Sequence, residues 1–263
     1  TFFGFQFFCC LFETVALSLR AHRKLMELRF RPSFGAPAPR ISQRFPLQMA
    51  GAALIWVLIS QLDKMVIAGM LPLKQFGVFS MALALASGVV LIAAPFGTLT
   101  PVKLTALGGP NSPDAISFYR ASSRLAAVLV GALASVLALN AGDALYLWTG
   151  DPILADTAST VFACYVVGNA IQAISAFPYF LQFSSGDMRF HLLGSLLFAA
   201  VLVPSMIWGA RNLGMNGAGY AWLGTNLIYA ALWLPLVHSR VDHILHRRWI
   251  YQDIAPGFGG ALL

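Results

Sequence analysis

The sequence has few charges and few cysteines, and each shortage argues against a class of protein. Charged residues make up 10% of the 263 residues, whereas soluble domains carry roughly a quarter. Hydrophobic residues reach 58% and mean hydropathy is +0.73. A soluble globule, a disordered chain and a fibre therefore all fit poorly. The cysteines, Cys9, Cys10 and Cys164, form no CxxC motif and predict no disulfide framework.

Motifs for covalent chemistry are also lacking. The sequence contains no HExxH, no GxSxG and no pair of carboxylates suited to acid–base catalysis. We therefore expect no catalytic site, no metal and no cofactor. His238, Asp242 and His246 repeat every four residues and are suited to a metal, although a solvated basic tail is the favoured interpretation. Gly214, Gly217 and Gly219 follow no strand and have the wrong spacing for a nucleotide loop, so they predict a turn and a closely packed helix start.

Long apolar stretches are what the sequence does contain. A helix needs about 20 mainly apolar residues to cross the hydrocarbon, and six stretches suit this: 47–73, 75–102, 125–142, 157–186, 190–210 and 212–239. The predicted fold is all-α, a polytopic membrane bundle of six full transmembrane helices and one partial N-terminal helix. The expected organisation is a partial helix (1–19), a basic cytoplasmic connector (20–45), a six-helix lobe (46–239) and a cytoplasmic tail (240–263). Because the chain starts at Thr1 without signal-peptide features, we expect it to be part of a longer protein.

Basic residues alternate with these spans. Fourteen of the 17 Lys and Arg residues fall on one side when the spans are counted in turn. Cytoplasmic loops retain Lys and Arg, so this bias predicts a multi-pass protein of the bacterial inner membrane with a cytoplasmic C-terminus. It also explains the net charge of +7 without nucleic acid.

Ionisable residues inside a span are the strongest functional signal. Asp63 and Lys64 interrupt the first full span, with Gln61 beside them. Ionised groups at membrane depth cost about 3 kcal/mol each and normally face a bundle interior or a watery cavity. One interpretation is that Lys64 reaches the outer surface with Asp63 as its partner. The other is that the pair lines a polar cavity.

Two further groups of polar residues are candidates. Lys103, Arg120 and Arg124 are expected to meet at the cytoplasmic ends of two spans, either as topological bias or as a basic mouth that attracts phosphate. The amides Asn169, Gln172 and Asn226 lie mid-span, where they either join helices or bind sugar hydroxyls.

Four segments resemble the second half of bacterial polysaccharide flippases. Residues 58–82 contain Gln-Leu-Asp-Lys, like the Asp and basic residue of that family's seventh helix, and residues 73–79 resemble the opening of its eighth. Residues 147–151, Leu-Trp-Thr-Gly-Asp, resemble its outer turn between helices nine and ten. Residues 217–222, Gly-Ala-Gly-Tyr-Ala-Trp, resemble the start of helix twelve. The resemblance covers about residues 45–239.

The flippases that the chain resembles form the oligosaccharide-lipid branch of the multidrug, oligosaccharidyl-lipid and polysaccharide exporter superfamily. This resemblance implies a function. It implies that the chain is the C-terminal lobe of a two-lobe transporter whose N-terminal lobe is missing here. The implied activity is alternating access that flips undecaprenyl-diphosphate-linked oligosaccharide for surface polysaccharide synthesis. The implied partners are this lipid-linked oligosaccharide, membrane lipids and a coupling ion, H⁺ or Na⁺. The alternatives are a drug/cation antiporter of the same superfamily and a membrane polysaccharide polymerase or acyltransferase.

Overall fold

The computed structural model describes residues 2–27 and 44–256. The chain divides into two compact units, Thr1–Ser42 and Gln43–Leu263. The first unit contains helix α1 (Phe2–Glu27). The helix expected over residues 1–19 thus continues into the predicted connector, because residues 20–27 include the good helix formers Arg, Ala, Lys, Leu and Met. The rest of the connector up to residue 43 lies outside the described residues.

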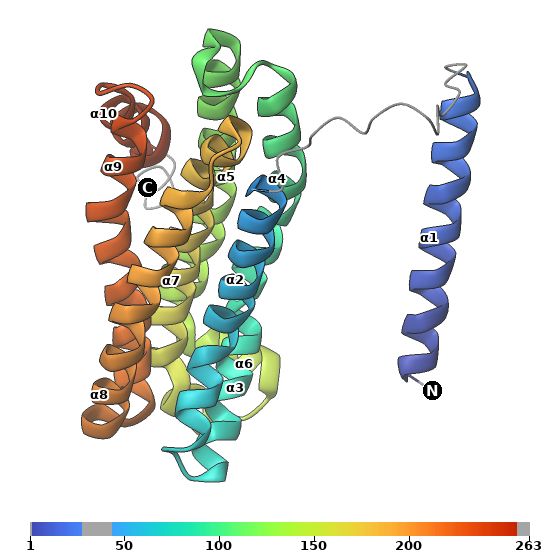
Figure 1. Cartoon of the computed structure of the whole chain (residues 1–263). Coiled ribbons are helices and arrows are strands. Elements are labelled where there is room, and N and C mark those ends of the chain that lie inside the picture. The colour runs from blue at the N-terminus through green and yellow to red at the C-terminus, as the bar shows by residue number, and fades with distance from the viewer. Residues whose placement is uncertain (1, 28–43, 257–263) are drawn as a thin grey trace. The chain divides into compact units, whose positions relative to one another are not determined.

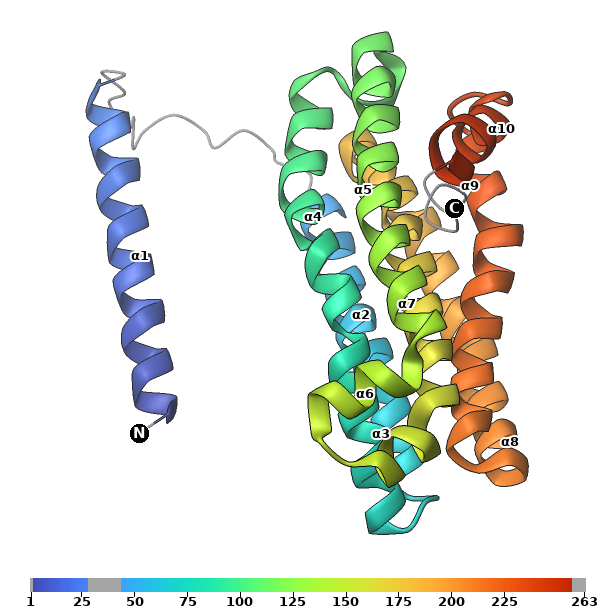
Figure 2. The same cartoon turned by 180° about the vertical axis from the view of Figure 1, so that it is seen from behind.

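The second unit is a bundle of helices (Figures 1 and 2). No strand occurs within the described ranges. Its α-helices are α2 (Arg44–Ala68), α3 (Leu73–Ala86), α4 (Gly88–Ala106), α5 (Pro113–Leu139), α6 (Ala141–Thr149), α7 (Pro152–Ser185), α8 (Arg189–Ile228), α9 (Leu234–Ser239) and α10 (Leu245–Arg248). Three short helices of other types join them: η1 (Gly109–Asn111), η2 (Tyr229–Trp233) and η3 (Trp249–Ile254).

Five helical segments are long and apolar enough to cross a membrane. They are Phe45–Ala68, Gly88–Ala106, Pro113–Leu139, Pro152–Ser185 and Arg189–Ser239. An all-helical fold with apolar helices of this length fits a membrane protein, as the composition predicts. The expected span 75–102 is divided between α3 and α4, which meet at Ser87 with the backbone still in the right-handed helical region (φ −64°, ψ −19°).

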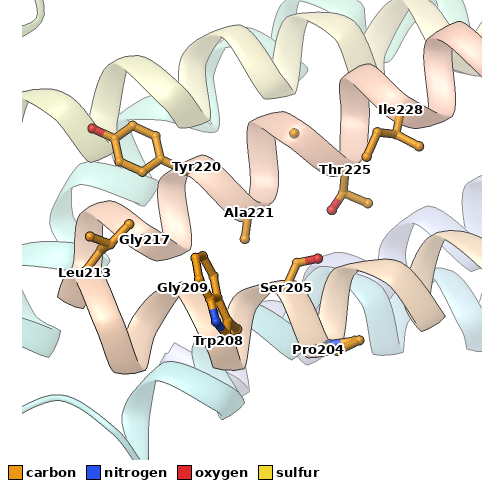
Figure 3. A pocket seen from close by; sticks show the side chains of 11 residues that line it. Pro204, Ser205, Trp208, Gly209, Leu213, Gly217, Tyr220, Ala221, Thr225 and Ile228 are labelled. Carbon is orange, nitrogen blue, oxygen red and sulfur yellow. The ribbon is translucent and has the colours of Figure 1, made fainter.

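The last segment reverses direction in its middle. Gly214 has φ +61° and ψ −143°, a conformation that only glycine adopts without strain. Beyond this point the chain runs back along itself, as Figure 3 shows. A Cβ at Gly217 would overlap the backbone carbonyl of Gly209 on the facing arm. A Cβ at Gly219 would lie 3.2 Å from the backbone of Val161 in α7. The prediction of a turn and a closely packed helix start is confirmed.

Helix α7 is the centre of the bundle. In an apolar 18-residue stretch of this helix, 67% of the residues are buried. The helix packs against α3, α4, α5, α6 and α8. Helix α2 is the most peripheral of the candidate spans, since only 11% of the residues in its corresponding 18-residue stretch are buried. It packs mainly along α8. The described side chains of α2 therefore divide between one face toward the bundle and a broad exposed face.

Most basic residues of the second unit lie at one of its two ends. The α4–α5 and α7–α8 connections and the α9–α10 region lie at one end, which we call the basic end (Figures 1 and 2). The basic residues of these segments are Lys103, Arg120, Arg124, Arg189, Arg240, Arg247 and Arg248. The α2–α3 turn, α6 and the reversal at Gly214 lie at the opposite end. Their charged residues include Lys74 and Arg211 together with Asp143, Asp151 and Asp156.

The C-terminal segment differs from the solvated tail that we expected. Leu245, Trp249 and Asp253 are all buried, with 3%, 1% and 0% exposure. Their four-residue spacing places them on one helical face, and this face packs against α5 and neighbouring helices. Leu245 and Trp249 bury large apolar side chains in this contact, and the Asp253 carboxylate finds arginine partners there. The segment therefore packs against the bundle instead of extending into solvent.

Candidate functional site

Asp63 points into the bundle. The outward-facing α2 surface carries Lys64, whereas Asp63 is 6% exposed and faces α7. The hydroxyl of Tyr165 in α7 donates to Asp63 Oδ2 at 3.3 Å, and the backbone N–H of Lys64 donates to Oδ1 at 2.7 Å. Among the described residues the Lys64 ammonium forms no ion pair with Asp63. The interpretation in which Asp63 is the ion-pair partner of Lys64 is therefore wrong, since successive helix residues point about 100° apart.

Lys64 belongs to a polar strip on the exposed face of α2. Ser60, Gln61 and Lys64 are all exposed, and their spacing of one, three and four residues keeps them on one side of the helix. Ser60 bonds to the carbonyl of Val57 in its own helix. The strip therefore presents an amide and an ammonium outward, while the carboxylate of the same turn is turned inward.

A buried network extends from Asp63 across three helices. The ring of Tyr165 stacks on Trp222 of α8, with centroids 5.4 Å apart and planes 7° apart. Trp222 Nε1 donates to Asn169 Oδ1 at 3.1 Å. Asn169 Nδ2 in turn donates at 3.0 Å to the carbonyl of Ala86, the last residue of α3. Asn169 thus joins α7 to both α3 and α8, which confirms the interpretation of this amide as a link between helices.

The other two predicted amides do not join this network in the same way. Asn226 is buried, but its amide donates to the carbonyl of Trp222 one turn earlier in its own helix. Gln172 is half-buried, and its side chain makes no hydrogen bond within the described residues. Of the three predicted amides, the structure therefore brings only Asn169 into an interhelical contact with the aromatic pair.

Tyr165 and Trp222 are the residues that sequence reasoning missed as part of this site. Tyr165 lies well inside α7, and Trp222 lies about two turns after the reversal at Gly214. Gly168, one turn from Tyr165, leaves the space that Trp222 fills, since a Cβ there would lie 2.5 Å from the indole. The available signal in the sequence was an aromatic residue within an apolar span; its contact with Gly168 follows only from the packing of α7 on α8.

Two of the predicted basic residues meet at a carboxylate. Arg120 donates through Nε to Asp253 Oδ2 at 2.6 Å, and Arg124 donates through Nη2 to Oδ1 at 2.6 Å. Arg120 Nη2 also donates to Gln252 Oε1 at 2.7 Å. Lys103, in the last turn of α4, is exposed and forms no ion pair in the described part of the chain. The expected basic mouth therefore reduces to two arginines that share Asp253, a partner that the sequence reasoning missed.

Two histidines lie near this ion pair, His238 in α9 and His246 in α10. Tyr119 and His238 approach at 2.7 Å between Oη and Nε2, and His238 and His246 at 2.9 Å between their Nδ1 atoms. Trp249 Nε1 donates to Ser123 Oγ at 2.9 Å. Asp242 is exposed, and the described residues contain no group of three potential metal ligands. Burial lowers the pKa of His246, so its imidazole favours the neutral form.

A separate groove of about 460 Å³ lies between the two arms of the last segment (Figure 3). Ser205 and Thr225 face it from opposite arms, and Trp208 and Tyr220 flank it. It begins where the arms diverge from the contact between Gly209 and Gly217. The groove is largely apolar and contains none of the charged residues predicted as functional.

Comparisons with known proteins found no match. No family model and no curated protein matches the sequence, and no solved structure matches the fold.

Proposed function

We propose that the chain is the C-terminal lobe of a bacterial inner-membrane transporter that flips undecaprenyl-diphosphate-linked oligosaccharide by alternating access. The observation that carries the proposal is Asp63, a carboxylate buried between apolar helices beside the exposed polar strip of Gln61 and Lys64. Ionisable residues held at membrane depth mark transport pathways and proton relays more often than structural sites. The resemblance of residues 58–82 to the seventh and eighth helices of flippases supplies the substrate class.

The topology supports a lobe of six passes. If α3 and α4 count as one pass and the two arms joined at Gly214 as two, the bundle crosses six times, and both ends of this unit lie at the basic end. The positive-inside rule then assigns the basic end to the cytoplasm. In this orientation the Asp63 region lies in the outer half of the bilayer, since Asp63 is near the C-terminal end of α2.

A second lobe gives the exposed polar strip a role. An ammonium facing lipid tails is costly, whereas one facing a hydrated cavity is not. Moving a diphosphate and several sugars through hydrocarbon is prohibitive without such a hydrated path. We therefore assign Gln61 and Lys64 to the wall of a cavity completed by the N-terminal lobe, where Lys64 interacts with diphosphate or sugar oxygens.

Asp63 is the proposed site of ion coupling. A carboxylate removed from water needs a counter-charge or a proton. The Lys64 ammonium forms no ion pair with Asp63 within the described residues, and the only side chain that the described structure hydrogen-bonds to Asp63 is Tyr165. Metal cations in proteins usually take several oxygen ligands, so a proton suits this site better than Na⁺. Exchange of the proton would change the bond to Tyr165 and hence the contact between α2 and α7.

The test uses the full-length protein in a strain that lacks its chromosomal copy. Asp63→Asn and Lys64→Gln are compared with Lys74→Gln, which removes the same charge from an exposed residue in the first turn of α3. The first two variants should lose surface polysaccharide and accumulate lipid-linked oligosaccharide on the cytoplasmic leaflet, whereas Lys74→Gln should export normally. Normal export by both test variants at wild-type expression would end the proposal.

Two further measurements separate the alternative functions. Drug resistance that depends on Asp63, without any effect on export, would replace the flippase by a drug/cation antiporter. Polymerisation or acyl transfer by the purified protein would replace both transport functions by an enzyme.

A further inference from the structure

The arginine pair at the basic end has more positive charge than its carboxylate partner compensates. Arg120 and Arg124 are four residues apart on α5 and both bind Asp253, whose side chain is fully buried. Two guanidiniums and one carboxylate leave a net charge of +1. The bonds to Asp253 and Gln252 use the Nε and Nη2 atoms, so the Nη1 N–H groups of both arginines make no hydrogen bond in the described part of the chain.

A pocket of about 610 Å³ lies on the α5 side of this ion pair. Both arginines line it, together with the polar residues Asn111, Ser112 and Ser117. The side chains of these three residues make no hydrogen bonds within the described ranges, so they are available to a ligand. Asp253 is not among the lining residues. The guanidiniums are therefore held from one side by Asp253 and open to the pocket on the other.

We propose that this arginine pocket, formed by Asn111, Ser112, Ser117, Arg120 and Arg124, binds a phosphate group, and that Asp253 is a built-in counter-charge that limits its affinity. Guanidinium N–H groups match phosphate oxygens in geometry and form charge-assisted bonds with them. The pocket lies along the first turns of α5, where the helix dipole also favours an anion. Asp114 in the first turn of α5 opposes this effect, but it is exposed and does not line the pocket.

The location at the basic end favours a phosphate carried by a lipid. The α4–α5 connection lies at the end of apolar helices long enough to span a bilayer, which is the level of lipid headgroups. The same chemistry also accommodates inorganic phosphate or pyrophosphate from solution. This inference rests on the membrane location and on the ion pair, and does not require that the chain transports anything.

The test measures binding to the purified full chain in detergent by native mass spectrometry. The probes are dioctanoyl phosphatidic acid, which has a phosphomonoester headgroup, inorganic pyrophosphate, and dioctanoyl phosphatidylcholine as the zwitterionic comparison. Arg124→Gln should raise the Kd for phosphatidic acid at least tenfold. Arg124→Lys keeps the charge but loses the paired donors, so its Kd for phosphatidic acid should lie between those of the parent protein and Arg124→Gln. Asp253→Asn should lower the Kd several-fold, because it removes the competing negative charge.

The matched control is Arg248→Gln, which removes an exposed arginine at the same end that does not line the pocket. This variant should bind phosphatidic acid with a Kd within about twofold of that of the parent protein. Tighter binding of phosphatidic acid than of pyrophosphate would identify a lipid headgroup site, and equal Arg124-dependent binding of both would identify a general phosphate site. The proposal is overturned if Arg248→Gln weakens binding as much as Arg124→Gln, if Asp253→Asn weakens it, or if neither phosphate probe binds more tightly than phosphatidylcholine. A failure here leaves the export test unaffected.

Discussion

The closest approach of two helical arms gives the sharpest prediction of stability. Gly217 and Gly209 meet backbone to backbone, and a Cβ at Gly217 would overlap the carbonyl of Gly209. A backbone carbonyl cannot rotate away as a flexible side chain can, so Gly217→Ala must push the two arms apart. Overpacking of a close contact typically costs about 1–3 kcal/mol, and the overlap with backbone favours the upper end of this range.

Gly224 provides the matched control because it lies two turns further along the same arm. A Cβ at Gly224 would meet nothing within 4 Å. Both substitutions gain the same helix propensity, about 0.8–1.0 kcal/mol for Gly to Ala. The difference between the two variants therefore isolates the overlap. Gly224→Ala should be slightly more stable than the parent protein, and Gly217→Ala should be less stable by about 1–2 kcal/mol.

The measurement is the thermal unfolding midpoint of each purified variant in the same detergent. Gly217→Ala should have a lower midpoint than the parent protein and Gly224→Ala an equal or higher one. If Gly217→Ala were as stable as Gly224→Ala, the arms would not touch at this point, and the reversal at Gly214 would have to be formed differently.

Three further changes test other parts of the bundle. The Asp151 carboxylate caps α7 by accepting hydrogen bonds from Ile153 N and Leu154 N at 2.9 and 3.1 Å. Asp151→Ala should therefore lower the free energy of unfolding by about 1 kcal/mol. The unfolding midpoint should fall, whereas the exposed control Asp156→Ala should leave it nearly unchanged. Trp222→Phe keeps an aromatic ring but leaves the buried Asn169 oxygen without its donor, at a cost of about 1–3 kcal/mol. The smaller side chain also leaves a void beside Gly168, so the unfolding midpoint should fall. His246 has a lowered pKa in the folded protein, so the unfolded chain binds more protons as the pH falls through about 6.5. The unfolding midpoint should therefore decrease from pH 7 to pH 5, and His246→Asn should reduce this decrease without abolishing it, because other histidines, such as the buried His238, remain.

Much of the fold follows from local signals in the sequence. Long apolar stretches predict helices because a membrane span must satisfy its own backbone hydrogen bonds. The reversal near Gly214 was predictable because glycine tolerates a positive φ and close approach. The break of the second expected span at Ser87 has a weaker local signal, the pair Ser87-Gly88. The predicted span 75–102 includes this pair without a break, and the backbone at Ser87 stays helical.

The candidate sites were less predictable because they depend on contacts between distant residues. Asp63 stands out as a charge within a span, but its partner Tyr165 is 102 positions away. The sequence also suggested Lys64 as the partner of Asp63 because they are neighbours, whereas helical geometry points them to different sides. Asp253 looked like one charge in a polar tail, and only the packing of Trp249 and Leu245 against the bundle brings it to the arginines.

The contacts of Asp63 and Asn169 also suggest how the two polar positions act together. Tyr165 and Asn169 are four residues apart on one face of α7, and Trp222 contacts both, by stacking on the first and by a hydrogen bond to the second. Asn169 also holds the end of α3 through Ala86. The contacts therefore run without a gap from Asp63 through Tyr165, Trp222 and Asn169 to the junction of α3 and α4. The buried carboxylate is thereby connected to the junction between two helices, and this connection uses hydrogen bonds and ring stacking without an ion pair at Asp63.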